Sequence, residues 1–600
     1  SRNIRETWSL RDDLTKIWGK HAFKAGYELL HFRLNSTSTN RPSGAFYFDD
    51  TTAGLRPDGT PVPNTGNTFA GFLFGSVREA YFDAELTSWL PRDSINSFYF
   101  QDDWKFTPTL TFNLGVRYSN ESPFHTKYGL ESNFDPNGTD ALTGLKGVIT
   151  HPTGNLNKRD NNNFQPRIGV AWHPMEKWVF RSGFAVNTVD IKFPSSRGQF
   201  DEFVGVNDQL RAPGDPRPLF QLSQGPAPVT FPSNGKNTAA YVNPSKNYSG
   251  RNVEWWDPNL RNPYVLNWNA SIQRQLSQNY ILEMSYQGSS GVGLLERWQQ
   301  NTFPQGYAAN DPALRAQVFA APQNFRPFPN YGNIMLRSNF GHSTYHGGTV
   351  KVDKRLSQGL SFSTFYTFSK VIDSQDNDND GNGVAPLQNR NLEKARAGYD
   401  RNHRLVGYAT YELPIGRGKK FMNRGGLMNA VLGGYEIAWI QTLESGNPYT
   451  FDFAGSPNNY YPGFSGSRRP DLVSQPTLLP NWGDVGGDRF NQANRNPVID
   501  INHFAYPAAF TPGNAGRNIM TGTRLLWSQV SAKKNWTIKE RVGIQLRWDF
   551  QNPFHNYNWS QPSSTVDFTQ PKLFGKLLAD QRTASVGGQA LMNLTLQVTW

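Results

Sequence analysis

The sequence predicts an all-β protein, an antiparallel transmembrane β-barrel with long loops on one side and short turns on the other. Three observations predict this fold class. Segments of about ten residues alternate between apolar and polar side chains, the connections between segments alternate between tight and long, and the composition is rich in aromatic and turn residues. Each of the three is typical of barrels that cross an outer membrane.

The composition separates this chain of 600 residues from ordinary soluble domains. Aromatic residues make up 14% and charged residues 18% of the chain, and Gly (55) and Pro (40) are frequent. Charged residues usually account for about 25% of a soluble domain. The absence of Cys excludes a disulfide framework, a thiolate metal site and a Cys nucleophile. The net charge of +12 is not gathered into basic runs, so nucleic acid is not an expected partner.

Alternation is clearest at residues 110–118, where every second residue is apolar and those between are polar or Gly. Successive side chains of a strand point to opposite faces, so one face of this segment is apolar. Segments 266–273, 542–550 and 592–600 follow the same rule. These strands run about nine to thirteen residues, close to the 9–11 that cross a bilayer and longer than the usual 5–6. The polar face would line a wet lumen, and aromatic residues near strand ends would form interfacial girdles.

No stretch of the chain approaches 18 uninterrupted apolar residues, which excludes a transmembrane helix. Only helices and closed barrels satisfy every backbone hydrogen bond in lipid. Because the apolar pattern has no helical period, a barrel is the expected membrane structure.

The connections fall into two classes. Tight connections are expected at 18–20, 107–109, 174–177, 277–278, 357–359 and 537–540, with a looser one at 416–433. Long polar excursions are expected at 34–94, 120–165, 188–263, 289–344, 372–400, 447–525 and 552–589. Short periplasmic turns and long extracellular loops are typical of outer-membrane barrels.

These connections give seven hairpins and a last strand at 590–600, fifteen strands in total. A bacterial barrel of a single chain needs an even number of strands. No signal peptide is visible at the first residues. We therefore expect the chain to be a C-terminal fragment that lacks earlier strands.

Several motifs resemble the β-barrel of TonB-dependent outer-membrane transporters, in particular its Oar-like branch. They include GKHAFKAG at 19–26, SFYFQDDWK at 97–105, FQPRIGVAW at 164–172, YDRNHR at 399–404 and YELPIGRG at 411–418. Further matching stretches lie at 110–118, 445–448, 469–472, 539–547 and 550–555. The resemblance extends over the whole chain, 1–600, in the family's order.

The resemblance implies a barrel of twenty-two strands, of which this chain would supply the eighth to the last. It also implies a plug and a carboxypeptidase-regulatory-like domain before the barrel, and neither is present in this sequence. The implied function is energy-coupled uptake across the outer membrane. The implied partners are outer-membrane lipid and lipopolysaccharide, the outer-membrane assembly machinery, and the TonB complex, reached through the missing plug.

Two sets of side chains are candidates for contact with substrate. Aromatic residues in the long loops could bind sugars or peptides by stacking, or could simply pack the loops together: Trp255, Trp256, Tyr331, Tyr460, Tyr461 and Phe464. Inward polar residues could bind a plug or a passing solute, or could only solvate the lumen: Arg117, Arg167, Arg181, Arg547 and Asp549. The substrate itself stays open among siderophore, oligosaccharide, peptide and cobalamin.

The last strand resembles the signal that the outer-membrane assembly machinery reads. It ends in an aromatic residue preceded by apolar residues at every second position, namely Met592, Leu594, Leu596, Val598 and Trp600. The simpler interpretation is an ordinary lipid-facing strand, and both can hold together.

Other motifs do not support an enzyme. Asp376, Asp378 and Asp380 with Gly381 reproduce half of a calcium loop, but Leu387 stands where its bidentate Glu belongs, so at most a weak Ca²⁺ site is expected. His342 and His346 lack the Glu of a zinc helix. No phosphate loop or nucleophile elbow is present. We therefore expect no cofactor and no catalysis.

Two alternatives stay open from the sequence. One is a passive porin or a surface adhesin barrel without energy coupling. The other is a secreted all-β enzyme that acts on glycans, since repeated aromatic strands also suit such a protein.

Overall fold

The structure is a computed structural model. It describes the chain except for residues 1, 38–40, 42, 49–61, 63–64, 86–87, 124, 130–131, 141–142, 151–154, 192–203, 211–216, 229–250, 305, 377–386, 455–467, 481–494, 539–541, 557 and 578–590.

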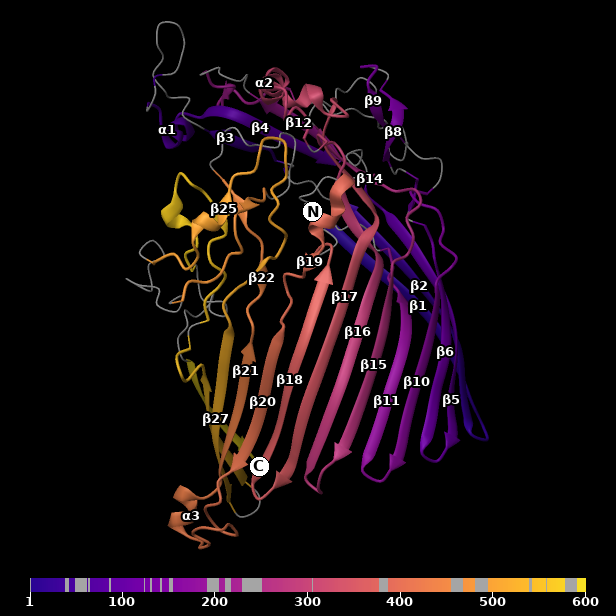
Figure 1. Cartoon of the computed structure of the whole chain (residues 1–600), viewed down its shortest axis with the longest axis vertical. Helices are drawn as coiled ribbons and strands as arrows, with labels where there is room; N and C mark the ends of the chain where they lie inside the picture. The colour runs from indigo at the N-terminus through magenta and orange to yellow at the C-terminus, as the bar shows by residue number, and fades with distance from the viewer. Residues whose placement is uncertain are drawn as a thin grey trace.

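Fifteen long strands form one curved antiparallel sheet, in which each strand lies beside its neighbours in sequence (Figure 1). We call this sheet the strand wall. Its strands are β1 (Arg2–Trp18), β2 (His21–Thr37), β5 (Pro91–Thr107), β6 (Leu110–Glu121), β10 (Phe164–Met175), β11 (Trp178–Thr188), β15 (Tyr264–Gln275), β16 (Tyr280–Gln299), β17 (Tyr331–Ser357), β18 (Leu360–Asp373), β20 (His403–Glu412), β21 (Tyr435–Glu444), β27 (Leu525–Ile538), β28 (Val542–Gln551) and β30 (Leu591–Thr599). The predicted all-β class is confirmed, and the described residues contain the expected fifteen long strands.

The two ends of the strand wall differ as the sequence predicts. At the turn end, tight turns join the hairpins, and Gln358 (φ 54°) with Gly359 (φ 78°) forms the paired left-handed backbone of a type I′ turn. At the loop end, the long excursions gather above the strands (Figure 1). The looser connection after β20 carries the short helix α3 (Leu427–Leu432) at the turn end.

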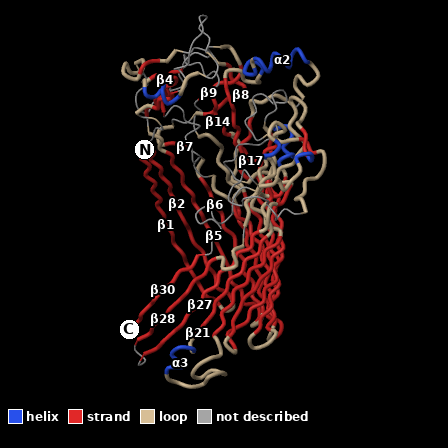
Figure 2. Tube along the Cα trace, turned by 90° about the vertical axis from the view of Figure 1, so that its left-hand side faces the viewer, coloured by secondary structure: helices blue, strands red, loops and turns tan. Residues whose placement is uncertain are grey.

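The strand wall does not close within the described residues. Among them, β1 pairs with β2 alone, and β30 pairs with β28 alone. Figure 2 shows these two edge strands on the same side of the molecule.

Cross-strand registers show that the wall has one apolar and one polar face. Leu114 pairs with Ile168, Ile168 with Phe184, and Phe184 with Trp268, so the apolar row continues from strand to strand. Ile168 is 56% exposed and Leu114 is 39% exposed. An apolar face that no other layer covers rules out a sandwich, in which such rows would be buried between two sheets. The predicted alternation and its lipid-facing orientation therefore agree with the fold.

Some strands run past the expected nine to thirteen residues. β16 has 20 residues and β17 has 27, and their ladder continues to the pair of Gln299 with Met335. The excursion expected at 289–344 is therefore shorter, because the backbone ladder of these two strands extends into the outer loops. At Trp298 and Leu336 the side chains are buried by those loops.

The excursions contain secondary structure of their own. Short strands add to the wall at β7 (His125–Thr126), β14 (Arg251–Trp256) and β19 (Ala395–Arg396). Separate small sheets are formed by β3 (Ala45–Phe48), β4 (Ser76–Glu85), β12 (Val204–Leu210) and β13 (Phe220–Gln221), by β8 (Asn133–Thr139) with β9 (Lys146–Thr150), by β22 (Pro448–Tyr449) with β26 (Met520–Thr521), by β23 (Asp452–Phe453) with β29 (Thr565–Val566), and by β24 (Asp471–Leu472) with β25 (Phe504–Ala505).

Helices are short, and α1 (Thr68–Leu73) and α2 (Pro312–Ala320) both lie in the excursions. Asp311 begins α2 by accepting hydrogen bonds from the backbone N–H of Ala313 and Leu314, with Pro at the first helical position. Single 3₁₀ turns are η2 (Pro322–Phe325), η3 (Leu387–Glu393), η5 (Ile501–His503) and η6 (Pro571–Leu573). In the described part of the chain, no helix is long and apolar enough to span a membrane.

Candidate functional site

The polar face of the strand wall carries both signs of charge. The registers place all five predicted inward residues on this face, on β6, β10, β11 and β28. Arg117 binds Glu28 at 2.5 Å, and Arg547 binds Asp549 at 2.8 Å. Arg181 donates to Gln273 and Arg167 to Asn187, at 3.1 and 3.2 Å. The wall therefore presents hydrogen-bonding groups in fixed positions, which suits contact with a polar partner or solute.

Three of the candidate aromatic residues lie at the loop end of the wall, in two separate clusters. β14 pairs in parallel with β17, which brings Trp255 and Tyr331 onto the ring of Phe134, at centroid distances of 6.1 and 5.2 Å. Tyr331 is fully buried and Trp256 is 1% exposed. The amide side chain of Asn133 binds both backbone groups of Trp256. In this arrangement the rings pack the excursions onto each other, and their contact with substrate stays a prediction.

The other three candidate aromatic residues, Tyr460, Tyr461 and Phe464, lie outside the described residues.

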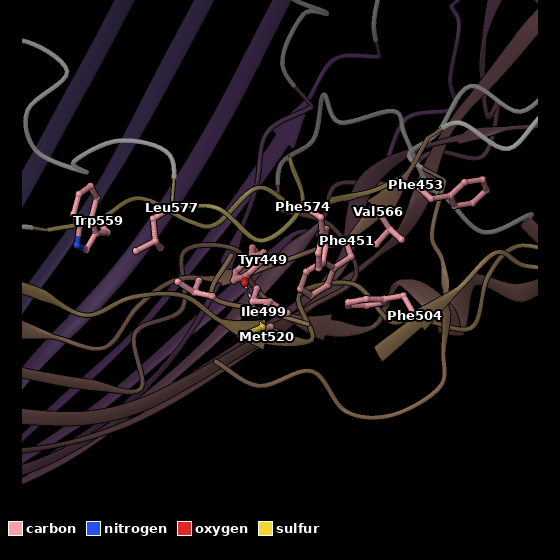
Figure 3. Packing of buried hydrophobic residues seen from close by; sticks show 11 residues of the cluster. Tyr449, Phe451, Phe453, Ile499, Phe504, Met520, Trp559, Val566, Phe574 and Leu577 are labelled. Carbon is pink, nitrogen blue, oxygen red and sulfur yellow. Dashed lines mark hydrogen bonds between the residues drawn. The ribbon is translucent and has the colours of Figure 1, made fainter. Parts of the chain in front are cut away.

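The largest apolar cluster among the described residues joins the last two excursions, and Figure 3 shows its side chains. We call it the aromatic core of the outer loops. Phe451 lies at its centre, 4.5 Å from Phe504 and 6.0 Å from Phe574, between ring centroids. Its members are Tyr449, Phe451, Phe453, Val498, Ile499, Phe504 and Met520 from the excursion after β21, and Trp559, Val566, Phe574 and Leu577 from the excursion after β28. The parallel pair of β23 with β29 ties the same two excursions.

A second apolar contact ties the excursion of α2 to the excursion after β21. The fully buried ring of Phe510 packs against Phe303 and Phe319, with centroids 6.0 and 5.3 Å apart. Phe510 holds a left-handed backbone (φ 60°), which is unfavourable for a bulky residue. The packing of its ring offsets that cost, so this contact fixes one excursion on another.

Buried ion pairs fix the same excursion on the top of β18 and on the excursion that follows β18. Arg517 contacts the carboxylate of Asp373 and, at 2.9 Å, that of Asp376. Burial raises the pKa of Asp373 to about 6, although the guanidinium of Arg517 acts to lower it. Arg469 and Glu393 form a second pair, of which both side chains are almost fully buried. Truncating one partner of such a pair leaves a buried charge without its counter-ion.

A carboxylate cluster lies where β5 and β6 reach the loops. Glu121 accepts from the backbone N–H of Ile191 at 3.1 Å and from the amide of Asn262, and Asp93 accepts from Ser122 at 2.8 Å. Burial, with the charge of Asp93 as a second cause, raises the pKa of Glu121 to about 8. The raised pKa makes the stability of this loop contact dependent on pH.

The weak calcium candidate is only partly described. Asp378 and Asp380 lie outside the described residues. The carboxylate of Asp376 binds Arg517 and accepts from the backbone N–H of Gly398, so protein donors already occupy it. Among described residues, no group of three His, Asp or Glu side chains is placed to hold a metal ion.

The last strand lies with its apolar row on the apolar face. Leu594 pairs with Trp548 and Leu596 with Leu546, and the side chains of this row are 43–65% exposed. Trp600 is 95% exposed. Its role as an assembly signal stays a prediction.

The sequence did not single out Phe510, Arg517 or Glu121. Phe510 and Arg517 lie in an excursion without any periodic pattern, so no local signal marks their partners. Glu121 offered a weak signal, since a carboxylate follows the alternating segment at the point where β6 ends.

Comparison with solved structures finds outer-membrane transporters and receptors. The chain resembles the outer membrane transporter YddB from Escherichia coli, with a TM-score of 0.48 and 8% identity over 99% of this chain and 53% of that chain. It also resembles the siderophore receptor PirA from Acinetobacter baumannii, with a TM-score of 0.41 and 10% identity over 96% of this chain and 54% of that chain. This chain thus spans about half the length of the solved structures it matches. No curated protein is significantly similar in sequence.

The family comparison covers nearly the whole chain. The outer membrane beta barrel domain family matches residues 1–587. This match agrees with a strand wall that has one apolar and one polar face, and an integral protein of the outer membrane does not fit the alternative of a secreted enzyme. The chain belongs to the outer membrane beta barrel domain family and is an integral protein of the outer membrane.

Proposed function

We propose that this chain is the C-terminal part of the barrel of a TonB-dependent receptor of the Oar-like branch. The receptor binds a substrate too large for porins at its outer loops and imports it with energy from the TonB complex. The plug, the regulatory-like domain and the remaining strands belong to the whole receptor and are not in residues 1–600. The barrel itself catalyses no reaction.

One observation supports this proposal most directly. The strand wall is wide and has a polar face, and the long excursions above it are packed together around buried apolar cores. A barrel of more than about sixteen strands encloses a lumen that side chains cannot fill. The aromatic core of the outer loops and the buried pairs of Arg517 and Arg469 hold the excursions in place above the wall. Loops fixed in this way are suited to binding a ligand, because little conformational entropy is lost when it binds.

The open edges of the wall support the proposal that further strands complete the barrel. Backbone N–H and C=O groups at a sheet edge cannot stay without partners in hydrocarbon. The outward edge of β1 and that of β30 have no pairing strand among the described residues.

Uptake in the native bacterium tests the proposed function. The full-length gene is deleted, and import of labelled siderophores, oligosaccharides, peptides and cobalamin is compared with that of the complemented strain. We expect one class to lose import on deletion, and the same class to lose import when TonB is removed or the proton gradient is collapsed. Import that is unaffected by both treatments would identify a passive porin, and surface binding without import would identify an adhesin.

A further inference from the structure

The apolar face of the wall carries ionisable side chains on three neighbouring strands, β1, β2 and β5 (Figure 2). Lys16 pairs with Phe23, and Phe23 with Asp102. Asp102 in turn pairs with Leu114 of the apolar row, so the whole cross-strand row points outward. Residues an even number of positions away on the same strands share this face. We call its ionisable members the charged outer patch: Asp12, Lys16, His21 and Asp102.

The strands that follow have no acidic side chain on the same face. The outward residues of β6, β10, β11 and β15, and of β16 up to Val292, are all described and include no Asp or Glu. There the row that contains Asp102 continues through Ile168 and Phe184. Acidic charge on the apolar face is therefore a local feature of β1, β2 and β5.

Both carboxylates of the patch lie within the membrane span of their strands. On β5, Trp104 and Phe106 separate Asp102 from the tight turn. On β1, Asp12 lies about 20 Å above Trp18 along the strand, at about 3.4 Å per residue. Aromatic residues near the strand ends mark the boundary of the hydrocarbon. From these positions an Asp side chain is too short to reach the lipid headgroups, although Lys16 can extend toward them.

Hydrogen bonds within the chain satisfy this patch only in part. His21 Nδ1 lies 2.7 Å from Oδ2 of Asp102, but the buried Oδ1 of Asp102 has no hydrogen-bond partner among the described residues. The side chains of Asp12 and Lys16 are exposed. Charged side chains destabilise a barrel when they face lipid, and ionisable residues of membrane-spanning segments almost always face protein or water. We infer that another protein surface covers the patch.

The distribution of charge indicates which surface that is. A patch with charge of one sign requires a partner of the opposite sign, whereas Lys16 and Asp102 place both signs in one row. Such a patch is complementary to a second copy of itself. A two-fold axis beside Phe23 would bring Lys16 of each copy toward Asp102 of the other.

We propose that the charged outer patch is the contact between two copies of this barrel that lie side by side in the outer membrane. Because the patch faces away from the lumen, this inference does not depend on the proposed import.

Cross-linking of the full-length protein in isolated outer membranes tests the contact. Residues 1–600 contain no Cys, and the protein without an introduced Cys gives the baseline. Ala25→Cys places a thiol within the patch, where Ala25 pairs with Leu14 and Phe100. The matched control is Ala270→Cys, at an outward position of β15 opposite Ser182. A short bis-maleimide joins two thiols only where two copies meet, and heat-modifiable gel mobility verifies that each variant is folded.

We expect Ala25→Cys to give a dimer band and Ala270→Cys to stay at the mass of the monomer. Asp102→Asn, added to Ala25→Cys, should lower the yield of dimer, because the charge opposite Lys16 is lost. Asp103→Asn changes the neighbouring carboxylate, which binds Asn113 on the polar face, and should leave the yield unchanged.

Three results would overturn parts of this proposal. A dimer yield from Ala25→Cys that is no higher than from Ala270→Cys would overturn the contact. A product with the mass of a different partner protein would overturn the assignment to a second copy. An equal yield with Asp102→Asn and with Asp103→Asn would overturn the pairing of charges across the contact.

Discussion

The strand wall and the outer loops are stabilised in different ways. In the wall, apolar side chains such as Ile168 and Phe98 are more than half exposed, so the surrounding medium decides their contribution. In the loops, Phe451 and Val566 are fully buried by neighbouring side chains, as in a soluble protein. The comparison shows that the same substitution can change stability differently in the two regions. The effect depends on whether lipid or other protein side chains surround the substituted residue.

The largest effect is expected in the aromatic core of the outer loops. Phe451→Ala removes a fully buried ring and should cost about 3–5 kcal/mol of loop stability. Hydrogen exchange should become faster in both excursions of the core and stay slow in the strand wall. The matched control is Phe554→Ala, which truncates a ring that is 59% exposed in the same region. Equal effects of the two changes would show that the core does not stabilise the loops.

A smaller effect is expected from a charge on the apolar face of the wall. Leu114→Arg should cost about 2–4 kcal/mol if the position lies near the bilayer midplane. The neighbouring change Asn113→Arg places the same charge on the polar face, beside Asp103, and should cost little. Urea unfolding in lipid vesicles measures both. A negligible loss for Leu114→Arg would contradict the orientation of the wall.

The carboxylate cluster should make loop stability depend on pH. Burial raises the pKa of Glu121 from 4.5 to about 8, so between these pH values the folded state binds more protons than the unfolded state. Stability contributed at this site should therefore fall as the pH rises through this window. Glu121→Gln keeps both acceptor contacts without titrating and should flatten the profile. Thermal midpoints from pH 5 to 9 measure it, with the exposed Glu176→Gln as control, and an unchanged slope would refute the assignment.

The smallest effect on the folded protein is expected at the last residue. Trp600 is 95% exposed, so Trp600→Ala should leave unfolding in lipid vesicles nearly unchanged. If the residue is part of an assembly signal, the amount of folded protein in the outer membrane should nonetheless fall in cells. Heat-modifiable mobility of the membrane fraction measures this amount. Normal assembly of the Trp600→Ala variant would contradict a role of Trp600 in the assembly signal.

The strand wall could be predicted from the sequence because its determinants are local. A period of two places Leu110 and Leu114 on one face without knowledge of any neighbour, and a short turn makes adjacent strands partners. The ends of β16 and β17 could not be predicted, because the ladder continues in residues that lack the alternating pattern.

The packing of the outer loops could not be predicted, because its determinants are not local in the sequence. Tyr449 packs in one cluster with Trp559 and Phe574, which lie in another excursion more than a hundred residues away. Such contacts leave no periodic trace in a single sequence. The same lack of local signal explains why the sequence left open whether Trp256 and Tyr331 contact substrate or pack the loops together; both are buried in the structure.

The shared core of the last two excursions has a consequence for how the outer loops of this barrel can diversify. Phe451 from one excursion and Phe574 from the other fill a common interior, and β23 and β29 run side by side within it. If one excursion were replaced by that of a relative, its core side chains would be shaped to pack against a different second excursion. Variants with exchanged outer loops should therefore fold when both excursions are replaced together, and chimaeras that exchange a single one should be recovered rarely.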